Sequence, residues 1–126
     1  MADKAQDLID KAETVAGKEN SETDVIKSMI ASARMMVDPQ ARWTTYGPVS
    51  STNREKAKDL DPTNPRPVFL EGQGLLYTPE SFGGGKAAAR PKFEEALKLF
   101  DAFKPASDLD PNWGRGSTMY FIGQTK

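Results

Sequence analysis

The sequence has no cysteine and no histidine among its 126 residues. This absence excludes disulfides, thiolate zinc sites, cysteine nucleophiles and acid–base catalysis by imidazole, and it leaves only carboxylate, lysine, tyrosine and serine chemistry. A charge excess is lacking as well, because 17 basic residues balance 18 acidic ones and the net charge is −1. Without a basic run, nucleic acid is not expected as a partner. No apolar run is long enough to span a bilayer.

Apolar residues are present mainly at helical spacing, which predicts an all-α protein of about five short helices. Two segments lack this spacing and contain glycine, proline and aromatic residues: QARWTTYGP and TPESFGGGK. They are predicted as long loops between helices, and residues 115–126 as an irregular or flexible tail. The apolar stripes cover residues 5–15, 26–37, 52–60, 65–76 and 89–103.

Three of the predicted helices carry an alanine in a similar setting, which indicates an internal repeat. Alignment on Ala12, Ala57 and Ala96 gives spacings of 45 and 39 residues. A tetratricopeptide repeat has a period of about 34 residues. The surplus residues fall in the two predicted loops, so both spacings are compatible with a repeat of this kind.

These residues resemble the tetratricopeptide repeat (TPR) family, whose two helices cross at small residues beside a large apolar one. Gly72, Ala89 and Phe93 match this pattern in the last unit. More narrowly, TPESFGGGK followed by FKPASDLDPNWG resembles a group of bacterial, often exported and mostly uncharacterised proteins of this class. The resemblance implies a right-handed α-α superhelix over residues 1–114. The units that it implies are an incomplete one at 1–18 and complete ones at 21–62 and 64–105.

The resemblance also implies a non-catalytic scaffold that binds a protein or a peptide. In the TPR family the first helix of each unit lines a concave groove, and exposed aromatic residues in a loop are a second candidate surface. The helix at 5–15 lacks its partner helix in this scheme, so its apolar face could bind a further unit, a second copy of the chain or the tail. The predicted partner-binding residues are Asp24, Ser28, Arg66, Phe69, Gln73, Leu76 and Tyr77 in the groove and Trp43 and Tyr46 in the first loop.

The motif GGGK suggests a second interpretation, an anion or nucleotide site at Gly83–Lys86. A phosphate-binding loop needs the pattern G-x-x-x-x-G-K-[ST], in which the hydroxyl holds Mg²⁺. Here Glu80 stands at the first glycine position and Ala87 at the hydroxyl position. We therefore expect a tight chain reversal that Tyr77 and Phe82 pack down, with nucleotide binding as the alternative.

Neither a metal nor a cofactor is expected. The acidic pairs in the two DLDP segments lack the glycine and the distal glutamate of a calcium loop, and they are typical of turns that end helices. Enzyme activity is not expected. A further alternative is a purely structural segment of a larger exported repeat protein. The sequence as given predicts a cytoplasmic location, or a periplasmic or exported one if a signal peptide preceded it.

Overall fold

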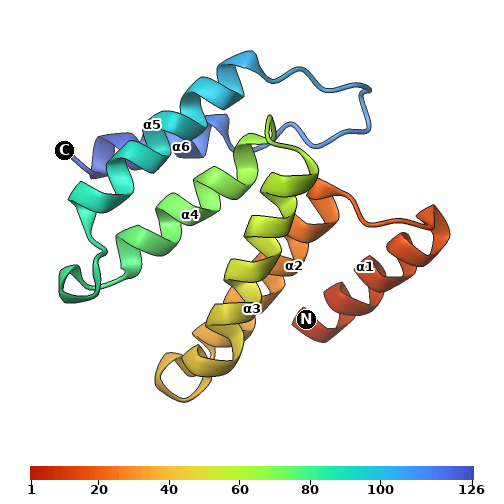
Figure 1. The fold of residues 1–126 in the computed structure, drawn as a ribbon, viewed down its shortest axis with the longest axis horizontal. Helices are drawn as coiled ribbons and strands as arrows, with labels where there is room; N and C mark the ends of the chain where they lie inside the picture. The colour runs from red at the N-terminus through yellow and green to blue at the C-terminus, as the bar shows by residue number, and fades with distance from the viewer. The chain divides into compact units, whose positions relative to one another are not determined.

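The computed structural model describes residues 1–126 and contains helices but no strand, so the prediction of an all-α protein is confirmed. The chain divides into two compact units, Met1–Pro62 and Thr63–Lys126, and each contains three α-helices (Figure 1). No helix combines the length and the apolar character that a membrane crossing requires.

The first unit consists of α1 (Ala2–Ala16), α2 (Ser21–Met36) and α3 (Pro39–Leu60). Helix α1 ends at Gly17, whose φ of 71° lies in the left-handed region that favours glycine. Helices α2 and α3 form a hairpin (Figure 1). Their contact is partly polar, because the Ser28 and Ser50 hydroxyls lie 2.9 Å apart. The apolar core of this unit is formed by Val25, Ile30, Ala31 and Ala57.

The first of the two predicted long loops is wrong, because QARWTTYGP lies within α3. The Asp38 carboxylate accepts a hydrogen bond from the Ala41 amide at 3.2 Å and caps the helix, and Pro39 stands where a missing N–H has no cost. Pro48 lies inside the helix and removes one hydrogen bond. Gly47 leaves room for the Trp43 ring, which lies 3.1 Å from where a Cβ would stand.

The second unit consists of α4 (Pro65–Tyr77), a short 3-10 helix η1 (Glu80–Phe82), α5 (Lys86–Ala102) and α6 (Arg115–Gln124). The predicted start of α4 is confirmed, since the Asn64 side chain accepts a hydrogen bond from the Arg66 amide at 3.0 Å. The core combines residues of α4 and α5, as the apolar stripes predict. Its buried members are Val68, Phe69, Ala89, Phe93, Ala96 and Phe100.

The prediction of an irregular tail at 115–126 is also wrong, because most of this segment forms α6. Two glycines within α6 lower the intrinsic helix propensity of this segment. Tertiary packing compensates, since the Phe121 ring stacks on the Phe93 ring with centroids 5.2 Å apart and planes at 9°. The Thr118 side chain of α6 is fully buried. Helix α6 is therefore held by contact with α5 rather than by its own sequence.

Two of the three aligned alanines lie in a similar environment, and the third does not. Ala57 and Ala96 are both completely buried in their helical hairpins. Ala12 is exposed, and α1 has no buried residue at all. The structure thus places Ala12 in a different environment from the other two alanines.

We predict opposite effects for two alanine substitutions in α4. A Cβ on Gly72 would lie 2.8 Å from Cε1 of Phe93, a ring that is fully buried and cannot move away freely. Gly72→Ala should therefore destabilise the second unit by about 1–3 kcal/mol. A Cβ on Gly74 meets nothing within 4 Å, so Gly74→Ala should stabilise it by up to about 1 kcal/mol through helix propensity. Urea unfolding followed by circular dichroism measures both, and equal effects would contradict the proposed contact.

Candidate functional site

Four of the nine predicted partner-binding residues are buried. Asp24 and Ser28 lie inside the first unit, at 0% and 1% exposure, and Arg66 and Phe69 lie inside the second, at 0% and 4%. The Arg66 guanidinium donates a hydrogen bond to the Pro111 carbonyl at 2.7 Å and faces three aromatic rings. These four side chains support the fold and do not form a surface for a partner.

The other five predicted residues reach solvent to different degrees. Tyr77 and Trp43 are exposed, at 76% and 62%. Tyr46, Gln73 and Leu76 are half-buried, and Leu76 packs against the core of the second unit. That these five residues contact a partner remains a prediction.

The glycine-rich turn between α4 and α5 uses its backbone amides internally. The amides of Gly83, Gly84 and Gly85 donate to the carbonyls of Glu80, Pro79 and Leu75 at 3.0, 3.1 and 2.8 Å respectively. Gly83 and Gly85 have φ values of 84° and 95°, and a Cβ on Gly84 would collide with the Thr78 carbonyl oxygen. Only glycine fits these positions. The expected tight reversal is confirmed.

The same hydrogen bonds argue against the nucleotide alternative. A phosphate cradle needs several backbone N–H groups that point toward the ligand. The three glycine amides of Gly83–Gly85 instead point at carbonyl groups of the chain itself.

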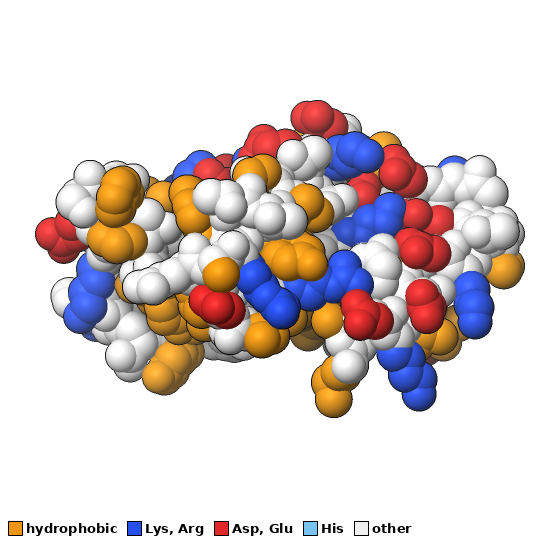
Figure 2. All heavy atoms as spheres, turned by 90° about the horizontal axis from the view of Figure 1, so that it is seen from below, with side chains coloured by type: hydrophobic (Ala, Val, Ile, Leu, Met, Phe, Trp, Pro, Cys, Tyr) orange, Lys and Arg blue, Asp and Glu red, His pale blue; other side chains and the backbone are white.

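The aromatic side chains beside the turn do not pack it down, so that expectation is wrong. Tyr77 and Phe82 are 76% and 82% exposed, and Lys86 is exposed at the start of α5. We call these three residues the glycine-turn surface. In Figure 2 hydrophobic side chains project beside a basic and an acidic one on the left, the side on which the α4–α5 turn lies in Figure 1. Phe82 was not among the predicted site residues, and Lys86 was named only in the nucleotide alternative. Phe82 belongs to no helical stripe, which is a sequence signal for exposure.

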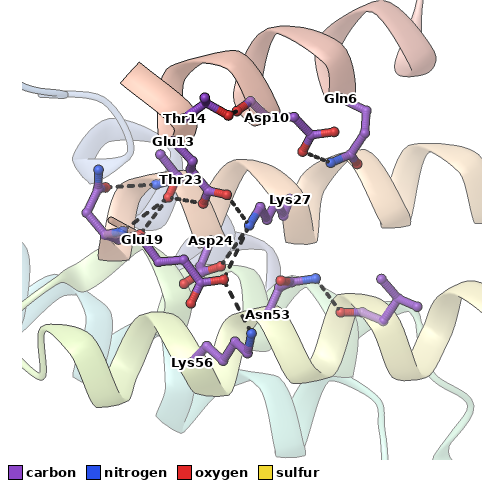
Figure 3. Close-up of polar contacts among 12 residues, drawn as sticks. Gln6, Asp10, Glu13, Thr14, Glu19, Thr23, Asp24, Lys27, Asn53 and Lys56 are labelled. Atoms are coloured by element: carbon purple, nitrogen blue, oxygen red, sulfur yellow. Dashed lines mark hydrogen bonds and ion pairs between the residues drawn. The ribbon is translucent and has the colours of Figure 1, made fainter. Parts of the chain in front are cut away.

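A second unusual feature is a group of charged side chains around the buried Asp24 in the first unit. The Lys27 ammonium lies 2.7 Å from a Glu13 oxygen, 3.6 Å from a Glu19 oxygen and 3.8 Å from Asp24 Oδ1. Lys56 lies 3.5 Å from the same Glu19 oxygen. The acidic side chains converge on Lys27 between α1, α2 and α3 (Figure 3). This cluster follows no pattern in the sequence, because its members are spread over three helices and a link.

The environment shifts the pKa values in this cluster in different directions. Burial raises the pKa of Asp24, and neither of its carboxylate oxygens has a hydrogen-bond partner. The hydrogen bond from Lys27 lowers the pKa of Glu13. Burial by itself would lower the pKa of Lys27, but its hydrogen bond to Glu13 and the surrounding carboxylates raise it overall.

The three carboxylates bring oxygens within 4.8 Å of one another, a spacing that suits a metal ion. The Lys27 ammonium, however, already lies within 3.8 Å of all three. It serves as the counter-ion that a cation would otherwise provide. The cluster is therefore a structural contact that holds α1 on α2. A second such contact is the ion pair of Asp3 and Arg34, whose charged atoms lie 2.7 Å apart.

Comparison with known proteins gives one informative similarity. No protein-family model matches the chain, and no curated protein matches it. Among solved structures, the chain is similar to the HusA haemophore from Porphyromonas gingivalis, with 40% sequence identity and a TM-score of 0.86. The similarity covers 98% of this chain and 61% of the haemophore chain.

This similarity corrects the functional prediction. The TPR resemblance implied a scaffold for proteins or peptides, whereas the similar structure is that of a haemophore. The scaffold function is thus wrong, because helix-pair patterns report how helices pack and not what their surface binds. A protein or peptide partner is not confirmed by this similarity.

We predict that the charged carboxylates of Glu13 and Asp24 act on the free energy of unfolding at pH 7 in opposite directions. The pKa of Glu13 is lowered from 4.5, so its stabilisation is present above that pH and is lost as the pH falls. Glu13→Gln should destabilise the chain at pH 7 by about 0.2–1 kcal/mol, with the difference vanishing in acid. The pKa of Asp24 is raised from 3.8, so ionisation above that pH opposes folding. Asp24→Asn should not destabilise the chain at pH 7.

The measurement is the free energy of unfolding of both variants and the unchanged chain at pH 7 and pH 3. A large loss of stability in Asp24→Asn at pH 7 would show that the buried carboxylate is stabilising in its charged form and would contradict this account.

Proposed function

We propose that this chain binds haem and acts as a non-catalytic haem carrier. The observation that carries the proposal is the 40% identity and TM-score of 0.86 to a haemophore over 98% of the chain. The chain spans 61% of the haemophore's length, so the proposal concerns the part of such a carrier that this chain represents.

The donor set of the chain restricts how haem could be held. Without histidine or cysteine, the iron could take only weaker or less common protein ligands, such as tyrosine oxygen or methionine sulfur. The macrocycle itself is flat, apolar and aromatic, with anionic propionates at one edge. Exposed aromatic side chains next to a basic residue fit such a molecule. The glycine-turn surface has this combination, and haem when bound would be cargo rather than a source of chemistry.

A haem carrier is more useful outside the cytoplasm, where free haem is captured. The periplasmic or exported alternative therefore agrees with the proposal, and nothing supports a cytoplasmic location. Haem, rather than a protein or a peptide, becomes the principal proposed partner.

We further propose the TPR-like right-handed superhelix as the finer architecture. Its support is the helical hairpin in each unit, with a fully buried alanine at Ala57 and at Ala96. The expected outcome is that successive helices alternate in direction along the chain. Residual dipolar couplings of the backbone amides measure helix directions in solution, and successive hairpins whose axes lie perpendicular would contradict the superhelix.

The carrier proposal is tested by titrating haemin into the purified chain and following the Soret band. We expect saturable binding with a spectrum that lacks the signature of histidine or thiolate ligation. Iron-free protoporphyrin IX should bind with similar affinity, because apolar contact dominates. The control is the same chain unfolded in urea. If neither porphyrin binds the folded chain better than the unfolded one, the proposed function is wrong.

A further inference from the structure

The glycine-turn surface is held in one conformation by the turn beneath it. The three amides of Gly83–Gly85 all donate to carbonyls within the second unit. Tyr77 is the last residue of α4, Phe82 ends η1 and Lys86 begins α5, so each side chain starts from hydrogen-bonded backbone. Binding at such a surface costs little backbone conformational entropy, which favours affinity.

The two aromatic side chains of this surface are largely exposed, Tyr77 at 76% and Phe82 at 82%. Neither Tyr77 nor Phe82 takes part in the ring contacts of the second unit, which join Phe69, Phe93 and Phe121 among others. An aromatic side chain can bury about 150–250 Å² of surface. The turn therefore offers exposed aromatic area that a flat apolar ligand could cover.

Lys86, the first residue of α5, supplies an exposed positive charge next to the same turn. The ion pairs of α5 join Arg90 to Glu94 and Lys92 to Glu71, and Lys86 belongs to none of them. Glu80 lies on the same turn, where its side chain packs against Gly85. Lys86 is accordingly the cation on this surface that is available to an anionic group of a ligand.

We propose that the glycine-turn surface is the porphyrin contact of this chain, with Tyr77 and Phe82 against the face of the macrocycle and Lys86 paired with a propionate. The proposal rests on the proposed haem-binding function and assigns it to three residues. It also explains the GGGK motif, whose glycines shape the turn while its lysine meets a carboxylate instead of a phosphate.

The test compares porphyrin affinities of the folded full chain and its variants, using haemin and iron-free protoporphyrin IX. The double variant Tyr77→Ala, Phe82→Ala should bind both porphyrins at least about tenfold more weakly, because it removes the ring contacts. Tyr77→Phe keeps the ring and should bind iron-free protoporphyrin IX as the unchanged chain does. Lys86→Ala should weaken binding about two- to fivefold and reduce its dependence on salt.

Tyr120→Ala is the matched control, because Tyr120 is a 62% exposed tyrosine of the same unit on α6. It should leave both affinities unchanged. Circular dichroism should show unaltered folding for all variants, since the substituted side chains are exposed. If the unchanged chain binds porphyrin and the double variant binds it equally well, this assignment is wrong while the carrier function stands. If the unchanged chain binds neither porphyrin, the carrier function itself fails.

Discussion

The close contact between Gly72 and Phe93 is the constraint on which the second unit depends. Because Gly72 has no side chain, α4 can approach α5 until the Phe93 ring lies against its backbone. The same ring then meets Phe69 and Phe121, whose rings also contact each other, with centroids 5.9 Å apart. One missing Cβ thus lets a single phenylalanine join all three helices of the unit.

This packing also sets the geometry of the turn that carries the candidate site. The chain reverses between α4 and α5 over residues 78–85. The reversal is made by left-handed glycines, and Gly85 is tied back to the Leu75 carbonyl. The amides that a nucleotide would need are therefore engaged by the fold itself. What the turn leaves available is its side chains, Tyr77, Phe82 and Lys86, which is why a motif that resembles a phosphate loop presents an aromatic and basic surface.

The sequence predicts those parts of the structure that depend on local spacing. The Asn64 cap and the crossing at Gly72 and Phe93 follow from helix signals and periodicity. The first half of α3 and the whole of α6 do not, because Pro48 and the glycines of α6 weaken local signals and distant contacts such as Phe121 on Phe93 compensate. The candidate site could be predicted only in part, since exposure of Tyr77 and Phe82 depends on where the core ends. A haem-binding motif could not be predicted either, because the chain lacks histidine and cysteine, the residues that most often mark a haem site.

The two units differ in what holds their helices together, and this difference bears on where the chain opens first. Aromatic rings fill the second unit. In the first unit α1 buries no residue and is attached by ion pairs, Asp3 with Arg34 and Glu13 with Lys27. Partly exposed pairs contribute little free energy and are screened by salt. Helix α1 is consequently the helix with the least stabilisation against local opening, whereas the turn surface belongs to the unit with the aromatic core.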